Sequence, residues 1–199
     1  IMFLLCIVLP AAAAPVISNH TSTHPEKIPV SAILAAKSRL HIAYWHTSHG
    51  SQITTGMSGL ARFPNAPYGG SAYTFNSGGT GGALDLSEPA FTDLGNSAWT
   101  TVTRNYLAAH PDVNVVMWSW CGQQSTASHA TVSSYLNKMN QLESEYPNVK
   151  FVYMTGHLDG SGPQGNLNMR NQQIRNYVRA HNKTLYDFAD IESYNPDGV

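Results

Sequence analysis

Two imidazoles and three hydroxyl groups lie within residues 46–52, whose sequence is HTSHGSQ. A serine hydroxyl becomes a nucleophile when a neighbouring base accepts its proton, and histidine is the side chain most often used as that base. Neutral imidazoles also bind transition metals. The cluster 46–52 therefore carries the groups needed for either nucleophilic catalysis or metal binding.

A strand-to-helix turn is the predicted setting of this cluster. An apolar, β-favouring run over residues 40–45 precedes it, and Ile53, Met57 and Leu60 follow it at helical spacing. In an open α/β sheet, such a turn lies beyond the carboxyl end of a strand, where ligands bind. The start of the helix also directs unpaired N–H groups at an anion.

The first hypothesis is a serine nucleophile. Ser48 comes directly after the expected strand, and Ser51 lies one helical turn further along. The sequence leaves open which of the two would act, although Ser48 has the better position. His157, which follows a second apolar run over 149–154, is the candidate base.

The second hypothesis is a metal site. His46 and His49 are three residues apart, and His157 with Asp159 would complete a ligand set suited to zinc or copper. A pair of histidines on an irregular turn is a weaker signal than a pair on one helical face. We therefore favour the serine, and the sequence predicts no metal and no cofactor.

The third hypothesis is a noncatalytic domain that binds carbohydrate. Aromatic side chains in polar loops can stack on sugar rings. The candidates for this role are Tyr68, Tyr73, Trp118 and Trp120.

The rest of the chain predicts the elements that position the cluster. Apolar strand patterns occur at 113–118, 149–154 and 184–188, and helical patterns at 97–110, 132–146 and 167–178 separate or precede them. Alternating strands and helices predict a mostly parallel sheet in an α/β/α sandwich. The polar turns that end these strands would then meet at one edge of the sheet.

Composition limits the partners. The 199 residues carry a formal net charge of −1, and only 12% are charged. No basic surface for nucleic acid or for an anionic membrane is expected from this balance. We expect a single monomeric domain over 31–199.

The N-terminus predicts export. Residues 2–9 are apolar, and Pro10 and the alanines 11–14 follow, as in a secretory signal that lacks its basic start. We therefore assign 1–14 to a signal peptide, 15–30 to a flexible tail, and the protein to a secreted or periplasmic location. Removal of Cys6 with the signal would leave only Cys121.

The order of these features resembles the SGNH (GDSL-like) hydrolase superfamily over roughly residues 38–190. In that family a Gly-Asp-Ser block follows the first strand, and His46-Thr47-Ser48 stands in its place here, with Gly50 next. The sequence His46-Thr47-Ser48-His49-Gly50 is more closely similar to a subgroup of the family that has a His-x-Ser-x-Gly block. The resemblance implies a flavodoxin-like sandwich, a catalytic Ser48 and hydrolysis of an ester.

The resemblance also implies positions for the oxyanion groups. Gly78 or Gly79 would supply the family's second-block glycine, and Gly122 its third-block glycine, while Gln124 stands where the family has asparagine. The family's C-terminal Asp-x-x-His is missing before the sequence ends at Val199. We therefore expect either a chain truncated at its C-terminus or a base that has moved to His157.

The sequence thus predicts a secreted SGNH-type esterase that removes O-acyl groups from a small or polymeric carbohydrate ester. Its alternatives are a noncatalytic carbohydrate-binding or degenerate SGNH-like domain and a histidine-based metal site. The predicted catalytic residues are Ser48 and His157. The residues expected to bind the oxyanion or the substrate are His46, His49, Gly79, Trp120, Gly122, Gln124 and Asp159.

Overall fold

The computed structural model describes residues 14–199. Residues 1–13, which hold nearly all of the expected signal peptide, lie outside the described residues. Within the described part of the chain, no helix has the length and apolarity needed to span a membrane.

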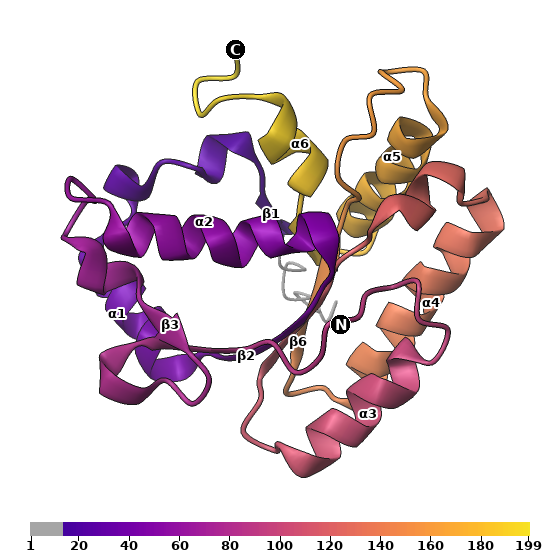
Figure 1. The fold of residues 1–199 in the computed structure, drawn as a ribbon. Helices are drawn as coiled ribbons and strands as arrows, with labels where there is room; N and C mark the ends of the chain where they lie inside the picture. The colour runs from indigo at the N-terminus through magenta and orange to yellow at the C-terminus, as the bar shows by residue number, and fades with distance from the viewer. Residues whose placement is uncertain (1–13) are drawn as a thin grey trace, which may run out of the picture.

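A seven-stranded parallel sheet forms the centre of the fold (Figure 1). Its spatial order is β1-β7-β6-β5-β2-β4-β3. All of its strand pairs are parallel; β2, for example, pairs Ile42 with Val115 of β5. The strands are β1 (Val16–Ser18), β2 (His41–Trp45), β3 (Phe75–Asn76), β4 (Leu84–Ser87), β5 (Val115–Trp118), β6 (Lys150–Met154) and β7 (Thr184–Tyr186).

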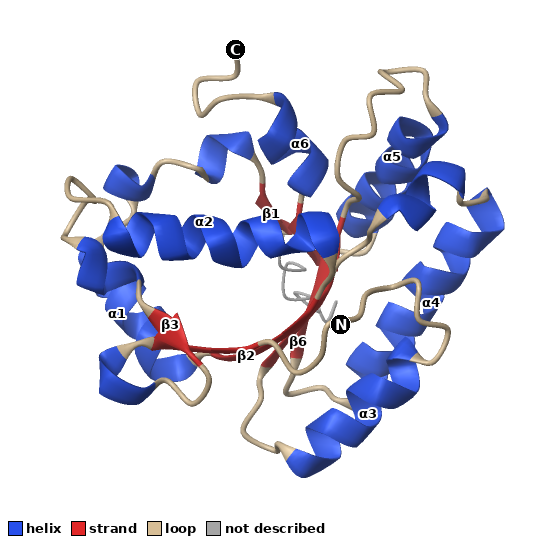
Figure 2. Cartoon of the chain, viewed as in Figure 1, coloured by secondary structure: helices blue, strands red, loops and turns tan. Residues whose placement is uncertain are grey.

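Helices cover both faces of this sheet, so the predicted α/β/α sandwich is confirmed (Figure 2). On one side lie α3 (Trp99–Ala109), α4 (His129–Glu145) and α5 (Asn166–Ala180). The opposite side carries α1 (Val30–Arg39), α2 (Ser51–Arg62) and α6 (Phe188–Ser193).

Alternation along β2 divides the core between the two faces. Ala43 and Trp45 join the large cluster beneath α3, α4 and α5, whereas Tyr44 joins the small cluster that contains Phe188 of α6. Successive side chains of a strand point to opposite faces, which is why one apolar run serves both layers. Trp45 stacks on Trp118 of β5 with a ring separation of 4.7 Å, and this pair fixes β2 against β5.

The predicted tail over 15–30 is wrong. Val16–Ser18 forms β1 and pairs in parallel with β7 at the edge of the sheet. His20 then bonds the Asp190 carboxylate through its backbone N–H at 2.8 Å and its Nδ1 at 2.5 Å. The polar composition and three prolines of this segment concealed a strand of only three residues.

Candidate active site

Ser48 lies at the carboxyl end of β2, on the short 3₁₀ turn Ser48–Gly50 that leads directly into α2. Its φ is +41°, a left-handed conformation that is uncommon for a residue other than glycine. The side chain is exposed, and no hydrogen bond of its hydroxyl occurs within residues 14–199. Backbone strain of this kind clusters at functional sites. Here the strained turn presents a free hydroxyl at the edge of the sheet.

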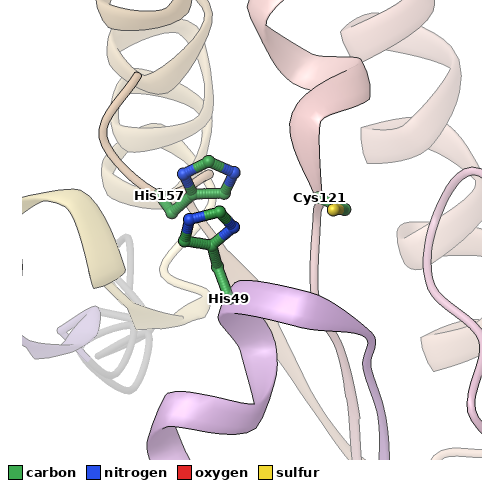
Figure 3. Close-up of side chains that lie close together, drawn as sticks. All are labelled: His49, Cys121 and His157. Atoms are coloured by element: carbon green, nitrogen blue, oxygen red, sulfur yellow. The ribbon is translucent and has the colours of Figure 1, made fainter. Parts of the chain in front are cut away.

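His157 reaches the same edge from the end of β6. It is buried, and its Nδ1 lies 2.7 Å from the Leu158 carbonyl oxygen. Because a carbonyl can only accept, Nδ1 carries the hydrogen, which leaves the lone pair of the neutral ring on Nε2. The ring stacks on that of His49, with centroids 3.6 Å apart and planes 11° apart (Figure 3).

The turn of Ser48 and the loop of His157 therefore meet through His49, the neighbour of Ser48. Among the described residues, Ser48 makes no hydrogen bond with either imidazole. Catalytic hydrogen bonds often tighten only when substrate binds, and catalysis by this pair would require a movement that brings Ser48 Oγ to His157 Nε2.

A buried amide network holds the loop that carries His157. The Asn171 side-chain oxygen accepts hydrogen bonds from the Gly156 N–H at 2.9 Å and from Gln124 Nε2 at 2.8 Å. The predicted role of Gln124 as an oxyanion donor is therefore wrong. Its side chain is 0% exposed and its amide nitrogen is committed to Asn171, so it supports the loop rather than contacting a ligand.

Gly156 is the tightest point of this network. A Cβ added there would lie 2.2 Å from Gln124 Oε1 and 3.2 Å from a methyl group of Leu167. We expect Gly156→Ala to lower the free energy of unfolding by about 1–3 kcal/mol, because the core around it cannot yield without breaking the amide network. Urea unfolding of the variant measures this loss.

Gly59→Ala is the matched control for that measurement. A Cβ at Gly59, on an exposed part of α2, meets nothing within 4 Å. Alanine should stabilise this helix position by about 0.5–1 kcal/mol. If both substitutions stabilise the protein, the loop around Gly156 is not close-packed.

His46 does not face the edge where Ser48 lies. It is buried, with Nδ1 3.1 Å from Ser51 Oγ and Nε2 2.5 Å from Glu88 Oε1. Its predicted role as a substrate or metal contact is wrong, because both ring nitrogens already have partners. The three side chains form a serine–histidine–carboxylate chain behind the first turn of α2, which keeps Ser51 a candidate nucleophile.

Two acidic residues of the loop after β4, Glu88 and Asp93, contact the residues of this site, and the sequence analysis did not single them out. Glu88 bonds His46, as above, and Asp93 accepts hydrogen bonds from Thr47 Oγ1, the Gly95 N–H and Gln123 Nε2. Asp93 thereby ties the turn of Ser48 to the loop after β5. The only feature of the sequence that could have pointed to these two residues was their acidity, in a chain with just 12 Asp and Glu residues.

The predicted oxyanion role of Gly79 is wrong. Gly79 packs against Asp85, whose register partner is His41 at the amino end of β2. The neighbouring Gly78 N–H donates to the same carboxylate at 2.7 Å. Strand β3 ends opposite Asp85, so the glycine-rich loop lies beside the start of β2, whereas Ser48 follows its end.

The prediction that aromatic side chains stack on sugar rings is also wrong for Trp118 and Trp120. Trp118 is fully buried against Trp45, and Trp120 is buried with its ring edge-on to Tyr135 at 5.0 Å. Both belong to the core. Tyr68 is exposed, but its hydroxyl donates to the Glu26 carbonyl on the N-terminal segment.

Two predicted residues stay accessible at the carboxyl edge. Gly122 is exposed directly after Cys121, in the loop that follows β5. Asp159 is exposed beyond His157, where the Ser161 hydroxyl and N–H bond its carboxylate at 2.5 and 2.9 Å. These hydrogen bonds hold the pKa of Asp159 below its usual value.

A cavity of about 420 Å³ opens next to His157. Leu158 connects the two, and the walls come from the loop 158–163, α5 and the end of α6. Neither Ser48 nor His157 lines the cavity itself. Its polar lining residues include Asp159, Ser161, Asn168, Ser193 and Tyr194.

A scan against protein-family models gives no match for this chain, and a search of curated proteins finds no relative.

Proposed function

We propose that the protein is a serine ester hydrolase with Ser48 as nucleophile and His157 as general base. One observation carries the proposal. Ser48 is an exposed serine with a free hydroxyl and a left-handed backbone, and the residue after it stacks on a histidine whose Nε2 lone pair is available. Acyl transfer requires a nucleophile and a base that can come together, and these two groups lie in loops that touch.

The chemistry follows from these atoms. His157 Nε2 accepts the hydroxyl proton as Ser48 Oγ attacks the ester carbonyl carbon, and the carbonyl oxygen becomes an oxyanion. N–H groups at the start of the turn Ser48–Gly50 have no intrahelical acceptor and can donate to that oxyanion. His157 returns the proton to the leaving alcohol, and water releases the acyl group by the same steps.

A polar ester is the substrate class that the surroundings favour. The cavity beside His157 combines hydroxyl, amide and carboxylate groups with apolar side chains such as Leu158 and Leu167 and with the half-exposed ring of Tyr194. Such a mixed lining offers polar groups to the hydroxyls of a sugar and apolar surface to the faces of its ring. Together with the signal-like N-terminus, this supports an exported SGNH-type esterase that removes O-acyl groups from carbohydrate.

Covalent labelling tests the nucleophile directly. The full chain is incubated with a fluorophosphonate, which phosphonylates activated serines, and the modified peptide is identified by mass spectrometry. We expect one label per chain, on Ser48, together with hydrolysis of nitrophenyl acetate that the reagent abolishes. A label on Ser51 would instead assign the reaction to the Ser51–His46–Glu88 chain.

The noncatalytic alternative gives a different result. A sugar-binding domain with this cavity would hydrolyse no ester and take up no label, although it would still bind oligosaccharides. Absence of both label and hydrolysis in the folded full chain would therefore reject the esterase proposal.

A further inference from the structure

Three potential metal ligands converge at the carboxyl edge of the sheet. His49, Cys121 and His157 follow β2, β5 and β6, and each offers a ligand atom within 4.8 Å of those of the other two. We propose that these three side chains bind a single Zn²⁺ ion. The sequence-based metal set is thereby replaced, because His46 is committed to Glu88 and Cys121 takes part instead.

To hold the ion, the two histidine rings must leave their stacked arrangement, because a metal lies in the plane of each imidazole that binds it and these planes are nearly parallel. With Zn–N near 2.0 Å and Zn–S near 2.3 Å, the tetrahedral ligand atoms of such a site lie about 3.3–3.6 Å apart. One nitrogen of each stacked ring already faces the side on which Cys121 lies (Figure 3). Rotation about side-chain torsions of the exposed His49 would close the remaining gap.

The hydrogen bond of His157 strengthens the assignment. A histidine that binds a metal usually donates its other ring N–H to a carbonyl or a carboxylate, which fixes the ring and its tautomer. The Nδ1–H of His157 donates to the Leu158 carbonyl at 2.7 Å, so the ring is held with Nε2 as its ligand atom. The buried position of His157 fixes it further.

The ligand chemistry selects the ion. Two imidazoles and one thiolate form a borderline-soft set that zinc prefers and that magnesium or calcium does not. Three protein ligands leave a fourth position for water, and His49, the exposed member of the set, lies in contact with solvent.

Zinc binding and the proposed esterase use the same lone pair on His157. An ion bound to Nε2 prevents that atom from accepting a proton, so zinc should inhibit ester hydrolysis. That consequence rests on the proposed function, whereas binding of the ion does not. The test therefore measures binding itself.

Cobalt titration provides the test. Full-length protein treated with a chelator is titrated with Co²⁺, whose bond to a thiolate gives an absorption band in the near ultraviolet. We expect one equivalent to bind with this band, and Zn²⁺ to displace it. Cys121→Ser should remove the band, and His49→Ala and His157→Ala should each weaken Co²⁺ binding by about tenfold or more.

Two variants serve as controls. Cys6→Ser removes the other cysteine, and His41→Ala disrupts the separate group of His41, Asp85 and Asp112. Both should leave the titration unchanged. Because His49 is exposed, His49→Ala should fold even if His157→Ala does not. The proposal would be overturned if His49→Ala and Cys121→Ser both bound Co²⁺ with the affinity of the wild type.

Discussion

Ser48→Ala is expected to lower kcat/KM for nitrophenyl acetate by about 10³-fold or more. Alanine removes the oxygen that we propose forms the acyl-enzyme, so the residual rate would come from binding and oxyanion stabilisation. Ser48 is exposed and its hydroxyl makes no described hydrogen bond, so the substitution should not affect folding. Initial rates and a thermal unfolding curve for each protein measure both effects.

Two further variants identify the partners of Ser48. Ser51→Ala removes a hydroxyl at the start of α2, next to the same turn, but it should keep most of the activity if Ser48 is the nucleophile, because the exposed Ser48 hydroxyl stays in place. His157→Ala should lose about 10²–10⁴-fold in kcat, the usual contribution of a general base. Wild-type rates for Ser48→Ala, or a greater loss for Ser51→Ala, would contradict the assignment.

Asp187→Ala should destabilise the fold by about 3–5 kcal/mol. Asp187 follows β7, and its carboxylate binds the Arg175 guanidinium through two hydrogen bonds of 2.7 and 2.8 Å. It also accepts one from Thr155 Oγ1 at 3.0 Å. The side chains of Arg175 and Asp187 are 14% and 4% exposed, so removal of the carboxylate leaves a largely buried cation without its ion-pair partner. The loss is read from urea unfolding.

A second arginine–carboxylate pair provides the comparison. Arg104 and Glu145 make the same two-bond contact at 2.7 and 2.9 Å, but their side chains are 33% and 32% exposed. Glu145→Ala should therefore cost less than about 1 kcal/mol. Similar losses for the two variants would show that burial does not set the strength of these pairs.

The fold could be predicted because the central strands have simple patterns. β5 is a continuous apolar run, and β6 is one after Lys150; both have the length that a doubly covered strand takes, and the helix α4, with clear periodicity, separates them. β1, β3 and β4 have two to four residues each, and polar residues such as Asp85 interrupt them. Their pairing depends on neighbouring strands, which a local pattern does not contain.

The site could be predicted only where topology alone decides it. Ser48 and His157 follow strands that must end at one edge, and the stacking of His49 on His157 shows that the turn and the loop that carry them meet there. The sequence did not predict the partners of His46 and Gln124. Those partners, Glu88 and Asn171, are distant in sequence, and their contacts depend on side-chain packing. Gly79 was misplaced because the position of β3 was unknown.

The pairing of β1 with β7 affects how the chain folds. His20 and Asp190, which join the same two segments, are 170 positions apart. Of the seven described strands, β1 is synthesised first, and its partner in the described sheet, β7, is synthesised last. Closing so long a loop is entropically costly and is repaid by few contacts, so we expect this edge to be the last part to form and the first to open. Hydrogen exchange should therefore be faster at Val16–Ser18 than at the central β5.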